Sequence, residues 1–170
     1  MVGDVTTSDS EPRWLDDQEM RSWLALVSLF IRLPAALDAQ LRHDAGISHF
    51  EYQVLAGLSM SDGRTMRMSS LAELADGSLS RLSHTMTRLE KRGWALRTPD
   101  PVDGRFTVAK LTDDGMAKVV ATAPGHVAAV RRHVFDPLTK RQAGQLDAIA
   151  RRILGTIGPG LDDPPWMERP

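Results

Sequence analysis

Hydrophobic positions between residues 17 and 157 recur mainly at steps of three and four, the spacing of one face of an α-helix. A first long helix is predicted from Asp17, with a kink at Pro34 and an end near Gly46. The same spacing predicts further helices over residues 49–60, 70–75, 78–93, 113–134 and 140–157, and the helix over 113–134 is predicted to break at Pro124-Gly125.

Helix starts are marked by a short oxygen-bearing side chain that precedes a Glu or Gln by three residues. In this capping box each of the two side chains accepts a hydrogen bond from the other residue's backbone N–H, so the pattern predicts where a helix begins. The chain has four such pairs, Asp16 with Glu19, Ser48 with Glu51, Ser70 with Glu73, and Thr139 with Gln142.

After Gly93 the hydrophobic period changes to that of β-strands. Residues 94–98 and 105–112 are predicted to form a hairpin around the loop PDPVDG, which is rich in turn-forming residues. The preceding short helix, the Asp76-Gly77 break and a longer polar-faced helix make a helix-turn-helix, and the hairpin makes it winged. The predicted fold is therefore mainly α, with one small β-hairpin wing.

The helix predicted over residues 78–93 has two contrasting faces. Leu79, Leu82, Met86 and Leu89 are expected to form one buried stripe. The opposite face offers hydrogen-bond donors and positive charge, which suit the phosphates and base edges of DNA; an ordinary solvated face is the alternative. The candidate DNA contacts on this helix are Ser80, Arg81, Ser83, His84, Thr87 and Arg88, with Lys91 on the same face.

Two of these residues carry the expected base recognition. Arg81 or Arg88 could form a bidentate pair with guanine O6 and N7. The hydroxyl groups of Ser80, Ser83 and Thr87 could form hydrogen bonds with phosphate or base. His84 could donate to either. Residues 64–112 hold nine lysines and arginines against five acids, a surplus of +4, although the whole chain has a net charge of −1. The positive charge is thus segregated, as a polyanion-binding surface requires.

Composition excludes several other classes. The chain has 42% hydrophobic residues and no cysteine, so it can fill a core but cannot use thiolate metal sites, disulfides or cysteine nucleophiles. No signal peptide is expected, and the apolar run 24–37 is shorter than a membrane span and is interrupted by Arg32 and Pro34. No catalytic motif is present, so a cytoplasmic protein that is not an enzyme is predicted.

No metal or other cofactor is predicted. His126 and His133, or His43 and His49, could in principle contribute to a metal site. Since no His-x-x-x-His pair accompanies them, packing or surface roles are the preferred interpretation.

Three stretches, in this order and spacing, make the chain resemble the MarR family of bacterial transcriptional regulators over residues 16–157. They are LAELAD (71–76), SLSRLSHTMTRLEKRGW (78–94) and PDPVDGRFTVAKLTDDG (99–115). The resemblance implies a dimer with intertwined terminal helices, in which each winged helix places one helix in a major groove and an arginine-bearing wing tip in the adjacent minor groove. Two departures, His84 for a common arginine and Gly104 for a usually basic residue, predict weaker phosphate contacts.

Asp103 and Arg105 match the family's wing signature. On physical grounds alone, Arg105 is a long, permanently charged donor that can enter a narrow minor groove. Asp103 cannot favour DNA by charge, so its expected role is to orient Arg105 or hold the wing through a charge-assisted hydrogen bond. The alternative is that both residues merely close the turn.

The resulting organisation is a mobile N-terminus (1–15), an N-terminal dimerisation helix (16–46), a winged helix-turn-helix lobe (47–112), C-terminal dimerisation helices (113–157) and a mobile tail (158–170). Trp23 either walls a pocket for a small aromatic or anionic effector or belongs to the core. The apolar residues of the terminal helices either pair two chains or fill a monomeric core. They are Trp23, Val27, Phe30, Leu33, Leu146, Ile149, Ile153 and Leu154.

The predicted function is a sequence-specific regulator, acting as a repressor, that binds a palindromic duplex as a homodimer and is released by an effector. Half-sites about 10 base pairs apart are expected from the symmetry of such a dimer. The alternative is a winged helix that binds protein instead of DNA.

Overall fold

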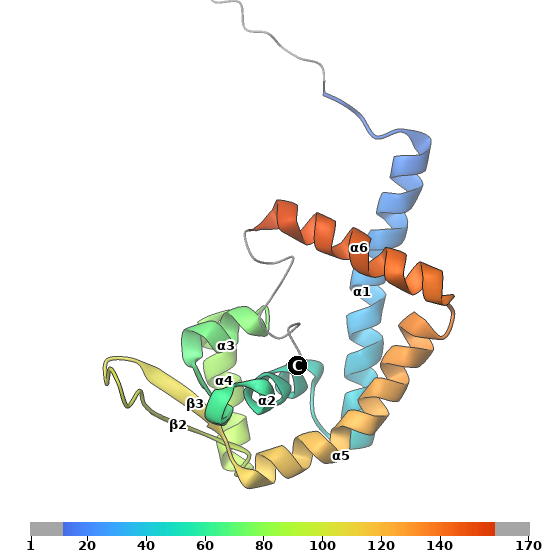
Figure 1. The fold of residues 1–170 in the computed structure, drawn as a ribbon. Coiled ribbons are helices and arrows are strands. Elements are labelled where there is room, and N and C mark those ends of the chain that lie inside the picture. The colour runs from blue at the N-terminus through green and yellow to red at the C-terminus, as the bar shows by residue number, and fades with distance from the viewer. Residues whose placement is uncertain (1–11, 159–170) are drawn as a thin grey trace, which may run out of the picture. The chain divides into compact units, whose positions relative to one another are not determined.

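The computed structural model describes residues 12–158, which are mainly helical (Figure 1). The chain divides into two units between Leu33 and Pro34, inside the first helix, α1 (Asp17–Ala45). The predicted helix is confirmed, including its end before Gly46, which has φ +65°. The mobility predicted for the two ends concerns residues 1–11 and 159–170, which lie outside the described residues, and a few residues beside them.

Three of the four predicted capping boxes are confirmed. They start α1, α2 (His49–Met60) and α6 (Lys140–Ile157). The box at Ser70 is wrong, because α3 (Met68–Leu74) begins two residues earlier with Arg67 as its N-cap, so Ser70 lies inside the helix. The earlier start follows from a short strand that ends at Arg67 and leads directly into α3.

The helix-turn-helix is confirmed as α3 followed by α4 (Leu79–Lys91), whose N-cap Ser78 accepts a hydrogen bond from the Arg81 N–H. In the turn Asp76 adopts a left-handed conformation (φ 47°). Gly77 is required because a Cβ there would lie 2.6 Å from the ring of Phe50 on α2. This close approach seats the turn directly on α2.

The sheet has three antiparallel strands in the order β1-β3-β2, one more than predicted. β2 (Ala95–Pro99) and β3 (Thr107–Leu111) form the expected hairpin, which extends away from α2, α3 and α4 (Figure 1). β1 (Thr65–Arg67) pairs with β3 from the other side. Its three residues are too few for a period of two to be recognised in the sequence.

The core of this lobe is formed by apolar residues of α2, α3, α4 and the sheet. In α4, Leu82, Met86 and Leu89 are fully buried, as predicted. Leu79 is not, since 55% of it is exposed, and the predicted four-residue stripe is wrong at that position. Leu79 lies in the first turn of α4 and lines an open groove beside the wing instead.

α5 (Asp113–Val130) starts against the sheet and is continuous through Pro124, so the predicted break there is wrong. The helix loosens later, in a π-helical turn over Arg131–Phe135. α6 (Lys140–Ile157) agrees with the prediction and has no buried residue in the single chain.

Trp94 occupies the junction between the end of α1, the end of α4 and the start of α5. The guanidinium of Arg92 and the ammonium of Lys118 lie 5.0 and 5.2 Å from its ring. The same two cations donate hydrogen bonds to the backbone carbonyls of Gly46 and Ala45, at 3.4 and 2.7 Å. Cations at the C-terminal end of α1 complement its dipole, and the indole packs between them.

Candidate nucleic-acid interface

The recognition-helix candidate α4 presents four distinct sides, which follow from its 100° step per residue. The buried side carries Leu82, Met86 and Leu89. Opposite to it, the outer ridge consists of Ser80, His84, Thr87 and Lys91, all exposed. These four residues have the spacing i, i+4, i+7 and i+11, so their side chains form one line along the helix.

On the flank towards α2, Arg88 is engaged with protein. Its Nε lies 3.0 Å from Glu51 Oε1, and its Nη2 donates to the buried hydroxyl of Thr85 at 3.1 Å. Only 7% of the Glu51 side chain is exposed. Burial would raise the pKa of Glu51, but hydrogen bonds from the Ser48 backbone and from Arg88 outweigh it, so the pKa is lowered. Arg88 therefore pairs with a carboxylate that stays ionised.

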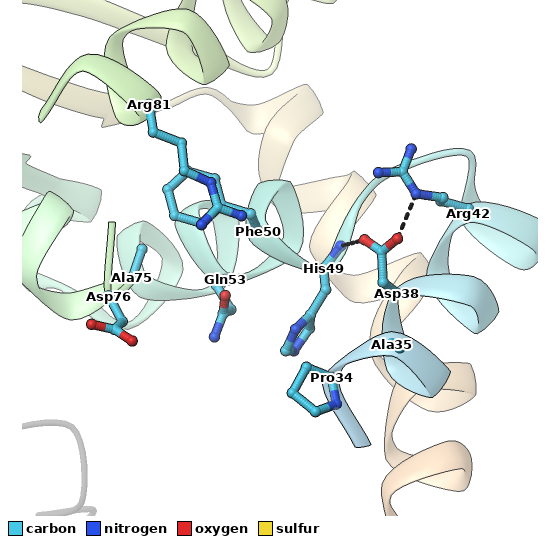
Figure 2. Close-up of a pocket in the computed structure, with 10 residues that line it drawn as sticks. All are labelled: Pro34, Ala35, Asp38, Arg42, His49, Phe50, Gln53, Ala75, Asp76 and Arg81. Carbon is cyan, nitrogen blue, oxygen red and sulfur yellow. Dashed lines mark hydrogen bonds and ion pairs between the residues drawn. The ribbon is translucent and has the colours of Figure 1, made fainter. Parts of the chain in front are cut away.

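Arg81 lies on the same flank, with its guanidinium carbon 4.0 Å from the centre of the Phe50 ring. Figure 2 shows this stack at the wall of an open pocket formed by the second half of α1, α2 and the turn before α4. On the α1 side of the pocket, Asp38 accepts the His49 backbone N–H at 2.8 Å and pairs with Arg42 at 2.6 Å. A guanine contact by Arg81 or Arg88 stays a prediction. Arg88 would first have to leave Glu51, whereas stacking on Phe50 uses the face of the Arg81 guanidinium and leaves its in-plane N–H groups to donate.

The other flank of α4 faces β2, where Arg97 contacts three of its residues. The guanidinium pairs with Glu90 at 2.6 Å and donates to the hydroxyls of Ser83 at 3.3 Å and Thr87 at 3.1 Å. The hydrogen bond from Arg97 lowers the pKa of the Glu90 carboxyl. Sequence reasoning missed Arg97, because nothing in a strand sequence tells which helix residues its side chains will meet.

At the wing tip, the hydrogen bond predicted between Asp103 and Arg105 is present, and the role of the pair in DNA binding stays a prediction. Its carboxylate accepts from Arg105 Nε at 2.9 Å, from Nη2 at 2.7 Å and from the Arg105 backbone N–H at 3.2 Å. The Arg105 side chain is nevertheless 84% exposed. The side-chain hydrogen bond from Arg105 is the main cause of the lowered pKa of Asp103. The pair ties the exposed Arg105 side chain to the loop of the hairpin.

The wing loop is organised by Asp100, a residue that sequence reasoning counted only as a turn former. Its buried carboxylate accepts the Val102 backbone N–H at 2.9 Å and the Nε of Arg67 at 2.8 Å. Arg67 in turn lies 4.4 Å from the centre of the Phe106 ring. The short β1 strand thus supplies Arg67, the cation that pairs with Asp100 and holds the loop of the hairpin. In the sequence, the signal for this role of Asp100 was its position two residues before Val102, whose backbone N–H it can accept.

Trp23 lies in the unit of residues 1–33 and is 50% exposed, so its interpretation as monomer core is wrong. Its role in effector binding stays a prediction. The histidine pairs considered from the sequence are not the ones brought together: His49 and His126 have ring centres 5.9 Å apart. Among residues 12–158 no three His, Cys, Asp or Glu side chains form a cluster that could hold a metal ion.

The fold is similar to those of solved structures. Sco3205 of Streptomyces coelicolor, a MarR family transcriptional regulator solved in complex with DNA, is 43% identical, with a TM-score of 0.82 over 87% of this chain and 93% of that one. The chain belongs to the MarR family. AbsC of the same organism, another MarR family regulator, is 36% identical, with a TM-score of 0.79 over 86% of this MarR-family chain and 98% of AbsC.

More distant structures agree in fold alone. A MarR variant from E. coli in complex with operator DNA is 19% identical to this MarR-family chain, with a TM-score of 0.70 over 83% of it and 99% of the variant. No family model and no curated protein matches the sequence. Sco3205 and AbsC, which are both more than 30% identical to this chain, are transcriptional regulators and not enzymes.

Proposed function

We propose that this MarR-family protein is a sequence-specific transcriptional regulator that binds double-stranded DNA as a homodimer. The observation that carries the proposal is the outer ridge of α4 together with the exposed Arg105 at the wing tip. A helix of 13 residues is about 20 Å long and has the diameter that a major groove accepts. The exposed arginine suits the neighbouring minor groove, where negative potential is enhanced in A·T-rich sequence.

The proposed contacts follow the sides of α4. Ser80, His84 and Thr87 would face base edges or phosphates, with Ser83 beside them. Arg81 and Arg88 would flank the ridge from the α2 side, and Asp103 would hold Arg105 in place. The similarity to Sco3205, which was solved with DNA, supports this orientation of α4 and the wing.

The homodimer is supported by apolar surface that the single chain leaves uncovered. In residues 17–33, Phe30 and Ile31 are 62% and 68% exposed, and Trp23 and Leu24 are also exposed. In α6, Leu146, Ile149, Ile153 and Ile157 are exposed at helical spacing. Burying such surface between two chains is the common solution in symmetric dimers, and a two-fold axis makes a palindromic operator the matching target.

By length and composition alone, α1 is also apolar enough to cross a membrane. We infer that a second copy of the chain, and not a membrane, covers the apolar surface of α1, because one dimer would cover the exposed apolar residues of both α1 and α6. We infer a cytoplasmic location because a regulator must reach DNA. A dimer that covers a promoter blocks access to it, so repression is the proposed sign of regulation. A small aromatic or anionic effector would release the DNA, through Trp23 or through the pocket beside Arg81.

The deciding experiment is a fluorescence anisotropy titration of the full chain with a labelled duplex, selected by the protein from a randomised library. The logarithm of affinity should fall linearly with the logarithm of salt concentration, by about 0.9 per phosphate contacted. Arg105→Ala should weaken binding and reduce that slope by about one for each wing. Arg13→Ala, which removes an exposed, acid-paired arginine before α1, is the matched control.

Two results would overturn the proposal. If no duplex is enriched and binding to any duplex is independent of salt, the winged helix is a protein-interaction module. If light scattering gives the mass of one chain at micromolar concentration, the homodimer is wrong. The variant Phe30→Lys tests the same interface and should shift the mass towards that of the monomer.

A further inference from the structure

The guanidinium of Arg97 links the wing to α4 at the edge of the outer ridge. Its Nε and Nη2 hold the two carboxylate oxygens of Glu90, at 3.0 and 2.6 Å, and its backbone N–H donates to the same carboxylate at 3.0 Å. Glu90 lies one turn beyond Thr87 and two turns beyond Ser83 on one side of α4. The planar guanidinium of Arg97 is therefore held by Glu90 on one side, and its remaining N–H groups point towards Thr87 and Ser83.

These remaining donors determine what the two hydroxyls can still do. Thr87 Oγ1 accepts from Arg97 Nη2 at 3.1 Å and donates to the backbone carbonyl of Ser83, also at 3.1 Å. Its hydrogen-bonding is largely used within the protein, so the methyl group is the part left to a ligand. Ser83 Oγ accepts from Arg97 Nη1 at 3.3 Å, and within residues 12–158 no acceptor is assigned to its proton.

We propose that Arg97 is a positioning residue that sets the chemistry the recognition helix offers to DNA. The proposal rests on the proposed function. With Arg97 in place, Ser83 presents an O–H donor, which fits a phosphate oxygen or a base acceptor such as guanine N7 or O6. Thr87 presents a methyl group, which fits the C5-methyl of thymine. Without Arg97 the Ser83 hydroxyl rotates freely and accepts or donates without preference, and the Thr87 oxygen, which still donates to the Ser83 carbonyl, is free to accept from a ligand.

A double-mutant cycle on the selected duplex tests the first half of the proposal. Ser83→Ala should weaken binding about tenfold, because both half-sites of the dimer lose a hydrogen bond. In an Arg97→Lys background the same change should cost less than twofold. Lysine can still pair with Glu90, but a single ammonium cannot span Glu90 and two hydroxyls. Arg13→Lys is the matched control and should leave the cost of Ser83→Ala unchanged.

Arg97→Lys also separates positioning from plain stability. A residue with only a structural role would change Tm and leave the effect of Ser83→Ala the same in both backgrounds. Equal costs of Ser83→Ala with and without Arg97, at equal Tm, would therefore overturn the proposal. Absence of duplex binding by the wild-type chain would instead refute the proposed function, so the two failures are distinguishable.

The second half of the proposal, a contact between the Thr87 methyl group and thymine, is tested by removing a methyl group from either partner. Thr87→Ser keeps the hydroxyl and removes the methyl, whereas Thr87→Val keeps a methyl and removes the hydroxyl. Thr87→Ser should weaken binding more than Thr87→Val, and it should abolish the loss of affinity caused by replacing operator thymines with uracils. The reverse order, or a wild-type protein indifferent to uracil, would overturn this assignment.

Discussion

Removing the Arg88 side chain discriminates between an arginine that braces the recognition helix and one that reads a base. In the structure its guanidinium contacts the buried carboxylate of Glu51 at 3.0 Å and the buried hydroxyl of Thr85 at 3.1 Å. Arg88→Ala leaves the carboxylate buried with only its bonds to the Ser48 backbone and hydroxyl, at 2.8 and 3.0 Å. The substitution should therefore destabilise the fold itself.

The magnitude follows from the environment of the pair. A hydrogen bond to a charged group contributes about 1.5–3 kcal/mol, and the value must be reduced here because half of the Arg88 side chain is exposed to water. A loss of about 1–2 kcal/mol is expected, which in a chain of this size lowers Tm by about 2–8 °C. Thermal unfolding followed by circular dichroism, with Arg13→Ala as control, measures this loss.

The pH dependence gives an independent check. The folded-state pKa of Glu51 is lowered from 4.5, so the pair stabilises the fold above pH 4.5, and this contribution is lost as the pH falls through the folded value. The Tm difference between wild type and Arg88→Ala should accordingly shrink in acid. An unchanged Tm at pH 7, combined with a tenfold or greater loss of operator affinity, would place the guanidinium on DNA and refute the brace.

Three further predictions concern stability. Burial lowers the pKa values of His49 and His126 from 6.5, so the neutral rings stabilise the fold above that pH, and Tm should fall as pH drops from about 7 to 5; if His49→Gln with His126→Gln shows the same profile, other groups are responsible. Gly115→Ala places a Cβ against the Trp94 backbone carbonyl and should cost about 3 kcal/mol in urea unfolding; a cost below about 1 kcal/mol would mean that α5 shifts freely. Met86→Ala empties a fully buried site and should cost about 2–5 kcal/mol in the same assay, against the near-zero cost expected for the exposed His84→Ala.

Local signals in the sequence predicted much of the fold because several of them are complete in a few residues. The boxes at Asp16, Ser48 and Thr139 need only the backbone of their own first turn, and each starts a helix. The capping box predicted at Ser70 is wrong because the pairing of β1 with β3 keeps the chain in an extended conformation only as far as Arg67. The helix α3 begins immediately after that residue. Pro124 failed as a breaker because a proline inside a long helix removes one hydrogen bond and the remaining helix continues.

The side-chain contacts of the candidate site were harder to predict from the sequence, because they join segments that are far apart along the chain. Arg88 and Glu51 are 37 residues apart, and Arg67 and Asp100 are 33 apart. A helical wheel places Arg88 on a polar flank but does not show that a carboxylate of α2 lies beside it. The pair of Asp103 and Arg105 was predictable because it spans only two residues.

The placement of Trp94 between two cations that hold the end of α1 gives the molecule a built-in optical probe. Indole emission depends on nearby charge and on water, and both would change if Arg92 and Lys118 released the carbonyls of Gly46 and Ala45. With Trp14 and Trp23 replaced by phenylalanine, the emission of the chain would come chiefly from this junction and from Trp166. Movement between α1 and the winged helix could then be timed in solution, without any attached dye, as DNA or a small molecule is mixed in.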